Sequence, residues 1–352
     1  MSTIRDSLPR LRRLIPRLRG KRMVVLGDLM LDRYVVGTAS RLSPEAAVPI
    51  VDFIEQTQRL GGAGNVAANL AALGARVECF GVTGEDEPGE ALRRILAAES
   101  IGNKGVLADK GRITTVKTRI IARHQQIVRV DHERREPLER KLQERLLGSV
   151  LRSLKKIEAV VLSDYDKGLI TDDFAERLLT ACHRSGVPVF VKPKTSRLYA
   201  YRGARAIVCN AKEAGFFITQ PITDDKSVEE AGQKLLSHFG CAAVLITRGD
   251  RGMSLIEEGS RHTMHIPATG VEVSYSRVGQ PGVERNATGR QVFDVTGAGD
   301  TVLSVLALGA AAGAALSDAA VLANAAAGVV VSKLGTATVG SQELQHAIDE
   351  LR

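Results

Sequence analysis

The stretch Asp294-Val-Thr-Gly297-Ala-Gly299-Asp300-Thr301, followed by an alanine-rich apolar run, is the most informative part of this chain. Its small residues let the backbone bend tightly, and a helix is expected directly behind them. Because the first amides of a helix lack internal partners, such a turn attracts an anion. Amides at Gly297, Ala298 and Gly299 beside the carboxylate of Asp300 suit phosphoryl transfer to a hydroxyl. A glycine-rich turn capped by Asp300 is the alternative interpretation.

The charge of the chain is concentrated at its start. The formal net charge is +8 over 352 residues, but residues 1–22 hold eight of the arginines and lysines against one aspartate. The apolar residues there recur at helical spacing, so we expect a first helix that packs by its apolar face. Binding of nucleic acid or of anionic lipid by this segment is the alternative. We expect neither a nucleic-acid nor a membrane partner.

Cysteine usage and hydropathy favour a reducing, cytoplasmic location. Cys79, Cys182, Cys209 and Cys241 lie far apart and form no paired spacing, so neither a disulfide framework nor a zinc site is expected. No run is long and apolar enough to cross a bilayer, and the N-terminus shows no secretory signal.

Strands and helices alternate along most of the chain. Short apolar strands at 23–27, 77–81, 160–164, 187–191, 206–209 and 243–247 alternate with helical segments. This pattern predicts an α/β fold with a doubly wound, mainly parallel central sheet flanked by helices. Two pairs of alternating strands, at 33–53 and 112–131, break the rhythm. We expect them to form a small β-sheet lid inserted into a single domain that spans residues 1–352.

Several short patterns suggest binding sites. Asn210 and Glu213 share a helix face after a strand and suit a hydrated Mg²⁺, or else they form a helix cap. Thr247-Arg248-Gly249 could contact a nucleotide or form a hairpin turn. Gly62-Ala-Gly64-Asn-Val-Ala67 matches a dinucleotide pattern, but the polar residues 56–59 predict no strand before it, so NAD is not expected.

The lid and the end of the first strand carry candidate substrate ligands. Asp28 and Asp32 could accept hydrogen bonds from sugar hydroxyls, or else cap neighbouring elements. Lys117, Arg119 and Arg123 alternate in one predicted strand and therefore share a face. That face could bind a phosphate of the substrate or be a solvated lid surface.

Taken together, these segments resemble the ribokinase-like (PfkB) carbohydrate kinases. The resemblance rests on residues 61–74 and 294–301 and spans roughly residues 20–350. Within that family the chain is most similar to the D-glycero-β-D-manno-heptose 7-phosphate kinases of lipopolysaccharide inner-core synthesis, through residues 27–34, 40–46, 162–168 and 324–336.

The resemblance implies roles for individual residues. Asp300 is implied as the base for the sugar's anomeric hydroxyl, with Gly297, Ala298 and Gly299 as the anion hole. ATP is implied as the phosphoryl donor, with Mg²⁺ held through water by Asn210 and Glu213. The implied nucleotide ligands are Thr247, Arg248, Gly249, Asn324 and Gly328. The implied sugar ligands are Asp28, Gly62 and Asn65. Asp294 and Thr296 correspond to a monovalent-cation site, with K⁺ as the candidate ion.

Some features depart from the family pattern. Lys192-Pro193-Lys194 stands where relatives carry Asp-Pro-Lys, which reverses a charge close to the expected metal and phosphates. The segment 269–291 is longer than the corresponding segment of close relatives, which predicts a surface loop. Some heptose kinases carry a fused nucleotidyltransferase domain. We expect none in this chain, so that adenylyl transfer would fall to another protein.

Two other functions fit the sequence, and one assembly is expected. The chain could be a PfkB kinase for another sugar or a nucleoside, or a non-catalytic sugar or nucleotide sensor that keeps the fold. Exposed strands in a lid invite pairing with a second copy. We therefore expect a homodimer through residues 33–53 and 112–131.

Overall fold

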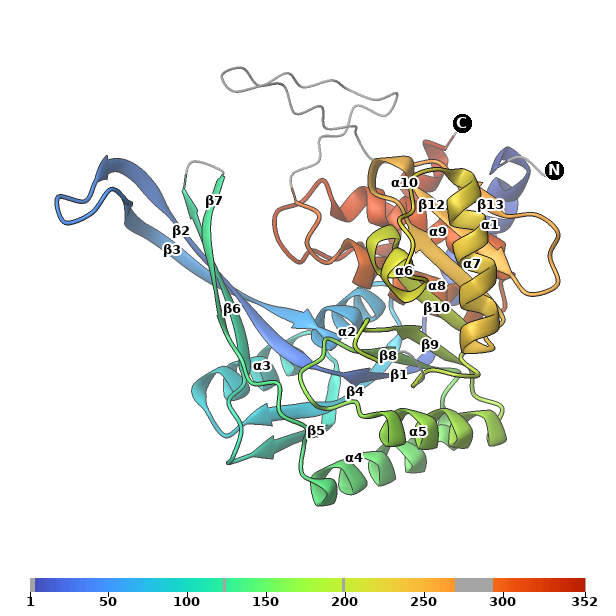
Figure 1. Cartoon of the computed structure of the whole chain (residues 1–352), viewed down its shortest axis with the longest axis horizontal. Helices are drawn as coiled ribbons and strands as arrows, with labels where there is room; N and C mark the ends of the chain where they lie inside the picture. Colours follow the sequence, from blue (N-terminus) through green and yellow to red (C-terminus); the bar gives the residue numbers. More distant parts are fainter. Residues whose placement is uncertain (1–3, 123–124, 198–199, 270–293, 352) are drawn as a thin grey trace.

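The computed structural model describes residues 4–122, 125–197, 200–269 and 294–351, and its strands form two sheets (Figure 1). The larger sheet has the order β13-β12-β11-β10-β9-β8-β1-β4-β5. Its strands are β1 (Arg22–Gly27), β4 (Arg76–Gly84), β5 (Gly102–Asp109), β8 (Ala159–Ser163), β9 (Val189–Lys192), β10 (Ala206–Asn210), β11 (Ala243–Thr247), β12 (Met253–Glu257) and β13 (Met264–Ile266). Among the described strands of this sheet, the β11–β12 and β12–β13 pairs are antiparallel and the other pairs are parallel.

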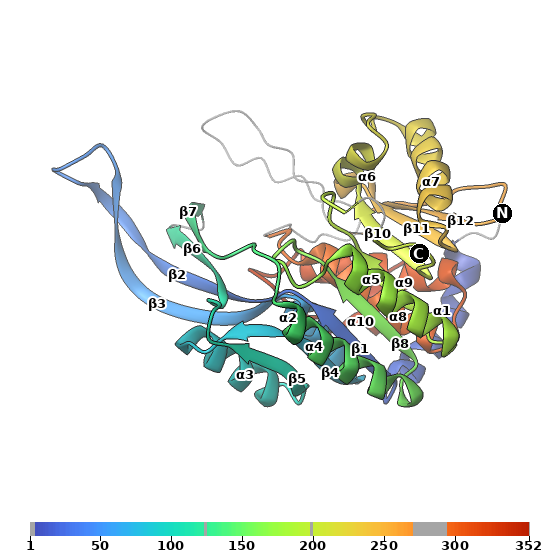
Figure 2. The same ribbon diagram turned by 60° about the horizontal axis from the view of Figure 1, so that its bottom comes forward.

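Helices cover both faces of the larger sheet (Figure 2). One face carries α1 (Ile4–Leu18), α2 (Ala63–Ala72), α3 (Glu87–Ala98), α8 (Ala298–Ala311), α9 (Leu316–Val330) and α10 (Ser341–Asp349). The other carries α4 (Arg140–Ser153), α5 (Asp172–Arg184), α6 (Ala211–Phe217) and α7 (Asp225–Phe239). Two short 3₁₀ turns, η1 (Leu154–Lys156) and η2 (Gly249–Arg251), complete the helical segments.

The apolar strand runs follow from this double cover. Val25 packs into the core on one face, while its neighbours Val24 and Leu26 pack into the core on the other. Because both faces of a parallel sheet are buried, its strands need no polar alternation. The prediction of a doubly wound, mainly parallel sheet is therefore confirmed.

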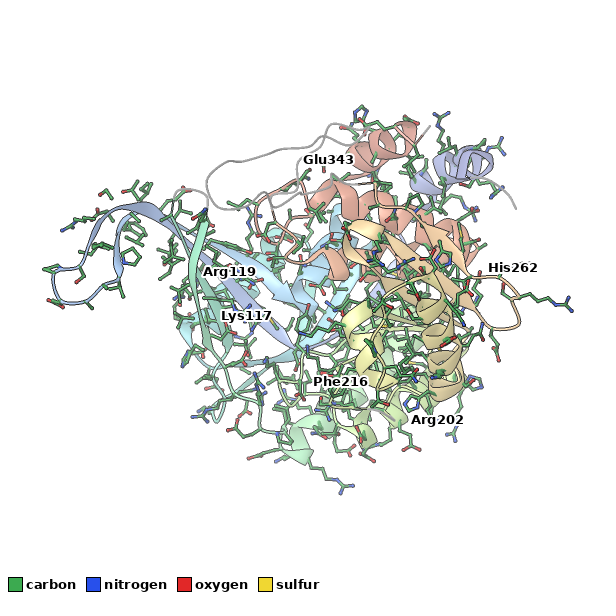
Figure 3. The ribbon with its side chains drawn as sticks, turned by 45° about the horizontal axis from the view of Figure 1, so that its top comes forward. Lys117, Arg119, Arg202, Phe216, His262 and Glu343 are labelled. Atoms are coloured by element: carbon green, nitrogen blue, oxygen red, sulfur yellow. The ribbon has the colours of Figure 1, made fainter. Side chains whose placement is uncertain are left out.

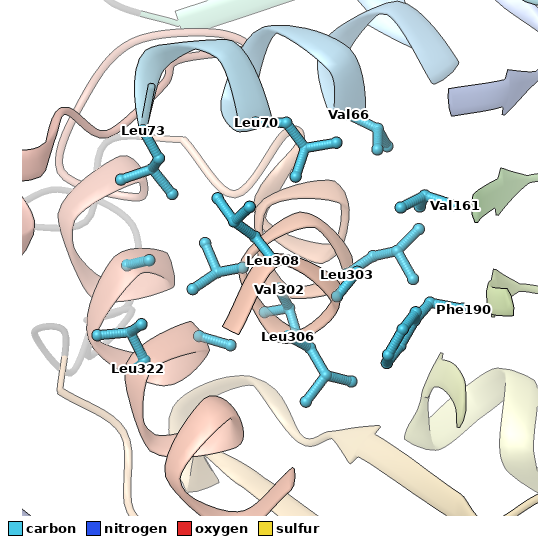
Figure 4. Packing of buried hydrophobic residues seen from close by; sticks show 14 of the residues in the cluster. Val66, Leu70, Leu73, Val161, Phe190, Val302, Leu303, Leu306, Leu308 and Leu322 are labelled. Atoms are coloured by element: carbon cyan, nitrogen blue, oxygen red, sulfur yellow. The ribbon is translucent and has the colours of Figure 1, made fainter. Parts of the chain in front are cut away.

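Helix α8 is buried among apolar side chains for most of its length. Figure 4 shows Leu70 of α2 on one side of this helix, and Val161 of β8 and Phe190 of β9 on another. A helix that is apolar all round is expected to be buried in this way, and close packing leaves it little freedom to shift. The turn at its N-terminus, which carries Asp300, is therefore held in a fixed place relative to the sheet.

The small sheet has the order β3-β2-β6-β7 and projects from the main body (Figure 1). Its strands are β2 (Leu29–Leu42), β3 (Pro49–Gly62), β6 (Thr115–Ala122) and β7 (Gln125–His132). The first two strands therefore extend beyond the predicted limits of 33–53. Strand β2 follows β1 after a single residue, and β3 runs directly into α2. Both ends of the β2–β3 hairpin are therefore joined to the main domain.

One expectation about this region was wrong. A strand does precede the Gly62–Ala67 pattern, because β3 runs to Gly62. Its residues 55–59 are polar and exposed or half-buried, so the usual apolar signal is missing directly before the glycines. Strand β3 pairs antiparallel with β2, whereas the dinucleotide motif requires a parallel βαβ unit.

The basic N-terminal segment forms the packed helix that was expected. Leu11, Leu14 and Leu18 of α1 are buried in the core, while Arg10 pairs with Asp318 of α9. The arginines thus face solvent or acidic partners on neighbouring helices. Among the described residues, no helix combines the length and apolarity needed to cross a membrane.

Candidate active site

A cavity of about 380 Å³ lies between the small sheet and the carboxyl edge of the larger sheet. We call it the central cavity. From the small sheet it is lined by Met30, Asp32, Gly62, Lys117, Arg119, Arg129 and Asp131. The rest of its wall is Glu133, Arg135, Tyr165, Asp166, Lys167, Lys194, Thr296, Gly297, Asp300 and Thr336. Figure 3 shows Lys117 and Arg119 on β6 of the small sheet.

The topology of the larger sheet explains where this cavity forms. From β1 the chain continues to β4 and β5 on one side, whereas from β8 it continues to β9, β10 and β11 on the other. Strands β1 and β8 pair in parallel, with Gly27 opposite Ser163. In open α/β sheets the ligand crevice lies at such a switch point, beyond the carboxyl ends of the strands. The residues that follow these two strands therefore meet at the cavity.

Asp300 is buried in the first turn of α8 and accepts hydrogen bonds on both carboxylate oxygens. Its Oδ1 accepts from the Tyr165 hydroxyl at 2.7 Å and from Lys192 Nζ at 2.8 Å. Its Oδ2 accepts from Asn65 Nδ2 at 3.0 Å. Three elements thus orient one carboxylate at the wall of the central cavity, which is the arrangement that a general base needs.

The turn before Asp300 has the geometry expected from its glycines. Gly297 has φ +83° and precedes the first residue of α8, and a Cβ there would lie 2.7 Å from Asn65 Nδ2. Only glycine therefore fits this turn without moving the Asn65 amide. Of the three amides predicted to hold an anion, that of Ala298 donates to Val295 O at 3.2 Å in this structure.

Lys192 and Tyr165 are close partners of Asp300 whose arrangement the sequence does not reveal. Lys192 Nζ also donates to the Tyr165 hydroxyl at 3.0 Å, and its side chain is 19% exposed. Burial by itself lowers the pKa of Lys192, but the charge of Asp300 and the contact with Tyr165 outweigh it and raise that pKa. Burial and the charge of Asp300 also raise the pKa of Tyr165. The ammonium and the phenol therefore both keep their protons.

Lys117 and Arg119 lie in the cavity wall, paired with carboxylates. Lys117 Nζ donates to Asp131 at 3.1 Å and to Glu133 at 3.4 Å. Arg119 Nη1 donates to Asp32 Oδ1 at 2.5 Å, and both side chains are less than 10% exposed. The two cations alternate along β6 and reach the same cavity, as the parity of the strand requires. Arg123 lies outside the described residues.

Glu133 is the centre of a charged cluster at this wall. It accepts from Lys167 Nζ at 2.7 Å and from Arg135 at 2.9 Å, besides Lys117. Burial by itself raises the pKa of Glu133, but the bonds from Lys167 and Arg135 outweigh it and lower the pKa to about 2. The carboxylate therefore stays ionised at any physiological pH.

Asp28 lies below the cavity, outside its wall. Its Oδ2 accepts the backbone N–H groups of Tyr165 at 2.8 Å and of Lys167 at 3.1 Å. Burial and the nearby charge of Asp164 raise the pKa of Asp28 to about 6. In this structure its carboxylate thus shapes the loop after β8, which brings Tyr165 to Asp300. Asp32, by contrast, lines the cavity, where burial raises its pKa in spite of the Arg119 charge.

The residues implied for the nucleotide and metal lie outside the wall of the central cavity. Asn210 ends β10 and Thr247 ends β11, and the two are direct partners in the sheet. Asn210 and Glu213 form a capping box, in which Glu213 N donates to Asn210 Oδ1 at 2.8 Å and Asn210 N donates to Glu213 Oε2 at 3.0 Å. The cap that the sequence offered as an alternative is thus present, and the pair still offers carboxylate and amide oxygens at the end of a strand.

Other implied nucleotide residues make local contacts. The Arg248 guanidinium bonds to Asp225 and to Ser254, next to Gly249 in its turn. Asn324 Nδ2 donates to Pro267 O at 2.8 Å, and Gly328 is buried within α9. Most of the loop predicted at 269–291 lies outside the described residues.

Asp294 joins two backbone segments beside the Gly297 turn. Its Oδ1 accepts from Thr296 N at 2.8 Å, and its Oδ2 accepts from Gly335 N at 3.0 Å. In the part of the chain that the structure describes, no three histidine, cysteine or acidic side chains gather as a metal cluster. Asn210 Oδ1 and Glu213 Oε2 each accept a backbone N–H in the capping box, so a hydrated Mg²⁺, which needs few protein ligands, would have to use their remaining lone pairs.

Comparison with known proteins places this site in a family context. A family model described as pfkB family carbohydrate kinase matches residues 21–343. Two curated proteins named "Bifunctional protein HldE" are each 42% identical to this chain. The protein from Trichlorobacter lovleyi matches over 92% of the chain and 62% of its own length, and that from Geotalea uraniireducens over 94% and 64%. The chain thus spans less than two thirds of these relatives.

Solved structures show the same fold at lower sequence identity. Phosphofructokinase-2 from Escherichia coli, in complex with substrates and products, superposes with a TM-score of 0.75 at 19% identity, covering 94% of this chain and 99% of that one. Arabidopsis thaliana ribokinase complexed with ribose and ATP superposes with a TM-score of 0.70 at 18% identity, with the same coverage. At this identity the likeness supports the fold alone, and it confirms the ribokinase-like prediction.

Proposed function

Because this chain belongs to the pfkB family of carbohydrate kinases and is a sugar kinase, we propose that it uses ATP to phosphorylate D-glycero-β-D-manno-heptose 7-phosphate at O1. The product would be the 1,7-bisphosphate, an intermediate of ADP-heptose and lipopolysaccharide inner-core synthesis. The observation that carries this proposal is a cavity whose wall holds both the Asp300 carboxylate and the cations Lys117, Arg129 and Arg135.

Such a wall fits a sugar that carries both a reacting hydroxyl and a phosphate of its own. The hydroxyl would meet Asp300, while the phosphate would meet the cations of the cavity wall. Asp32, Gly62 and Arg119 also line the cavity. Asn65 orients Asp300, and Asp28 holds the loop that carries Tyr165. Because charged donors bind a phosphate strongly, the sugar phosphate would bind more tightly than the unphosphorylated sugar.

In the proposed reaction Asp300 accepts the proton of the attacking hydroxyl. The sugar oxygen forms a bond to the γ-phosphorus of ATP, the bond from that phosphorus to the oxygen of ADP breaks, and the proton passes to the Asp300 carboxylate. The amides of Gly297, Ala298 and Gly299 would hold the γ-phosphoryl oxygens, with the Ala298 amide turning from Val295 O to do so. Catalysis of this kind consists mainly of positioning and charge stabilisation.

The nucleotide would lie along the carboxyl ends of β9 to β11. The proposed ligands are Thr247, Arg248, Gly249, Asn324 and Gly328. Asn210 and Glu213 would hold hydrated Mg²⁺, which neutralises phosphate charge when it is bound. Asp294 is the proposed carboxylate near a monovalent cation such as K⁺. Each of these assignments comes from the family resemblance.

We further propose a cytoplasmic homodimer that pairs through the small sheet. Apolar side chains are exposed along β2, β3 and β7 and the turn between the first two. They include Leu42, Val48, Phe53, Ile54, Ile127, Val128 and Val130. Exposed apolar groups gathered on strands with free edges favour association with a second copy.

A substrate panel tests the proposed reaction. The protein is incubated with ATP, Mg²⁺ and, in separate reactions, heptose 7-phosphate, the same heptose without its phosphate, fructose 6-phosphate and ribose, and the products are identified by mass and NMR. We expect a 1,7-bisphosphate from the first sugar, and kcat/KM at least about 100-fold lower without the 7-phosphate. Faster turnover of a hexose phosphate or a pentose would identify another sugar kinase, and no turnover of any sugar would favour a sensor.

A substitution in the cavity wall tests whether Lys117 contributes to substrate binding. Lys117→Met should raise KM for heptose 7-phosphate by about 10–100-fold and change kcat little, because a bond to a charged group contributes about 1.5–3 kcal/mol. Lys226→Met, at an 84% exposed site on α7, is the matched control. Equal KM values in the two variants would remove the distal-phosphate assignment.

A further inference from the structure

Lys192 places a half-buried cation at the end of a central strand. It is the last residue of β9, and β9 lies between β8 and β10 in the larger sheet. The loop after β8 brings Tyr165 to the central cavity, and β10 ends at Asn210. Lys192 thus stands between the wall of the cavity and the residues proposed for the nucleotide.

The ammonium of Lys192 lies directly against the turn proposed to bind phosphate. A Cβ placed on Gly299 would lie 3.4 Å from Lys192 Nζ and 3.6 Å from its Cε. These are ordinary van der Waals distances, and they place the ammonium of Lys192 beside the backbone of this turn. An anion bound by the amides of this turn would lie within the reach of a charged N–H group.

The bonding of Lys192 leaves it able to bind such an anion. An ammonium has three donors, and among the described residues two are used, toward Asp300 Oδ1 and the Tyr165 hydroxyl. Lys192 Nζ also lies 4.9 Å from the centre of the Tyr165 ring. These contacts fix the ammonium in place before any ligand arrives, and the third N–H remains for a phosphoryl oxygen.

We propose that Lys192 is a catalytic residue whose ammonium contacts the phosphoryl group during its transfer. The proposal rests on the proposed kinase function and adds a residue to its site. In the transfer, charge spreads over the oxygens of the moving phosphoryl group, and a preorganised cation stabilises it there. The bonds that form and break are those given above, and Lys192 keeps its proton throughout.

Ligand binding tests this proposal without relying on turnover. The dissociation constants of ADP with Mg²⁺, with and without aluminium fluoride, are measured by calorimetry for the full chain, for Lys192→Met and for the control Lys226→Met. Aluminium fluoride completes a mimic of the moving phosphoryl group. We expect it to tighten ADP binding by about tenfold or more in the wild type and the control, and by less than about twofold in Lys192→Met.

The outcomes separate a catalytic contact from a purely structural ion pair. If Lys192→Met keeps the full gain from aluminium fluoride, or if the wild type shows no gain, the proposal is overturned. If the gain is lost while the affinity for ADP alone stays within about threefold, it is supported. This result would stand even if no sugar in the panel were phosphorylated, in which case only the proposed substrate would fail.

A double variant covers the case in which Lys192→Met does not fold. Lys192→Met combined with Asp300→Asn removes both charges of the buried pair, so neither group is left unpaired. The double variant should bind ADP normally and should still lack the gain. A gain of wild-type size in the double variant would overturn the assignment.

Discussion

Replacing Asp300 by asparagine gives the most direct test of the proposed chemistry. The amide keeps the size of the side chain and can still accept a bond from Tyr165, but it cannot take the proton of the attacking hydroxyl. A positioned general base contributes about 10²–10⁴-fold to a rate, so kcat should fall by that factor, which corresponds to about 3–5 kcal/mol in the barrier. The affinity for ATP should change by less than about threefold, because Asp300 does not contact the proposed nucleotide residues.

The same substitution should change stability only modestly. Lys192 would lose its charged partner while its side chain is 19% exposed, at a cost of about 1–3 kcal/mol. With an unfolding entropy of about 2.1 cal/mol/K per residue over 352 residues, Tm should fall by about 1–4 °C. A coupled ADP assay, calorimetry with ATP and a thermal melt measure the three quantities. Asp318→Asn, at an ion pair with Arg10 between α9 and α1 and outside the cavity wall, is the control. Turnover within about fivefold of the wild type would refute the assignment of the base.

Three further substitutions test the electrostatics and the assembly. The pKa of Asp28 is raised from its usual value of 3.8 to about 6 in the native protein. Between these two pH values the native protein holds a proton on Asp28 that the unfolded chain has lost, so stability falls as pH rises through this window. The free energy of unfolding of Asp28→Asn, relative to that of the wild type, should therefore increase by up to about 3 kcal/mol from pH 4 to pH 7.5, as measured by urea unfolding. An equal difference between the two proteins at both pH values would contradict this. Asp32→Asn leaves Arg119 buried without its carboxylate and should destabilise by about 3–5 kcal/mol in the same assay, whereas Asp52→Asn, at an exposed pair, should change little. Phe53→Asp should give a monomer by sedimentation at micromolar concentration, and a dimer that survives it would exclude this surface as the interface.

Features with a local signature could be predicted from the sequence. The apolar strands of the larger sheet are buried on both faces, and they read as short continuous apolar runs. The turn before Asp300 requires glycine because φ is positive at Gly297, and the glycines of the sequence indicate such a turn. The first helix was found because its leucines repeat at the helical period. In each case the residue types are determined by the surroundings of a single strand, turn or helix, so no distant contact has to be known.

Features that depend on distant partners could not be predicted. Strand β3 is polar at residues 55–59, which are exposed or half-buried, and this removed the signal for a strand before Gly62. The contact of Lys192 with Asp300 joins residues 108 positions apart and needs the strand order to be known. The sequence marked Lys192 only as a reversed charge and gave no indication that Tyr165 would join it.

The cations of the central cavity are already paired, and this limits how a substrate phosphate could bind. Lys117 donates to Asp131 and Glu133, and charged partners lower the pKa of both acids, so protonation does not release the lysine near neutral pH. Lys117 has a third N–H, whereas Arg129 donates two bonds to Asp131 and Arg135 donates two to Glu133, from side chains that are 48% and 69% exposed. A phosphate dianion can therefore be bound by sharing donors, without breaking the bonds of Lys117 to Asp131 and Glu133. On the proposed function, the two exposed arginines would supply affinity while Lys117 would fix the position of the phosphate, and this division of roles is why Lys117→Met should act on KM.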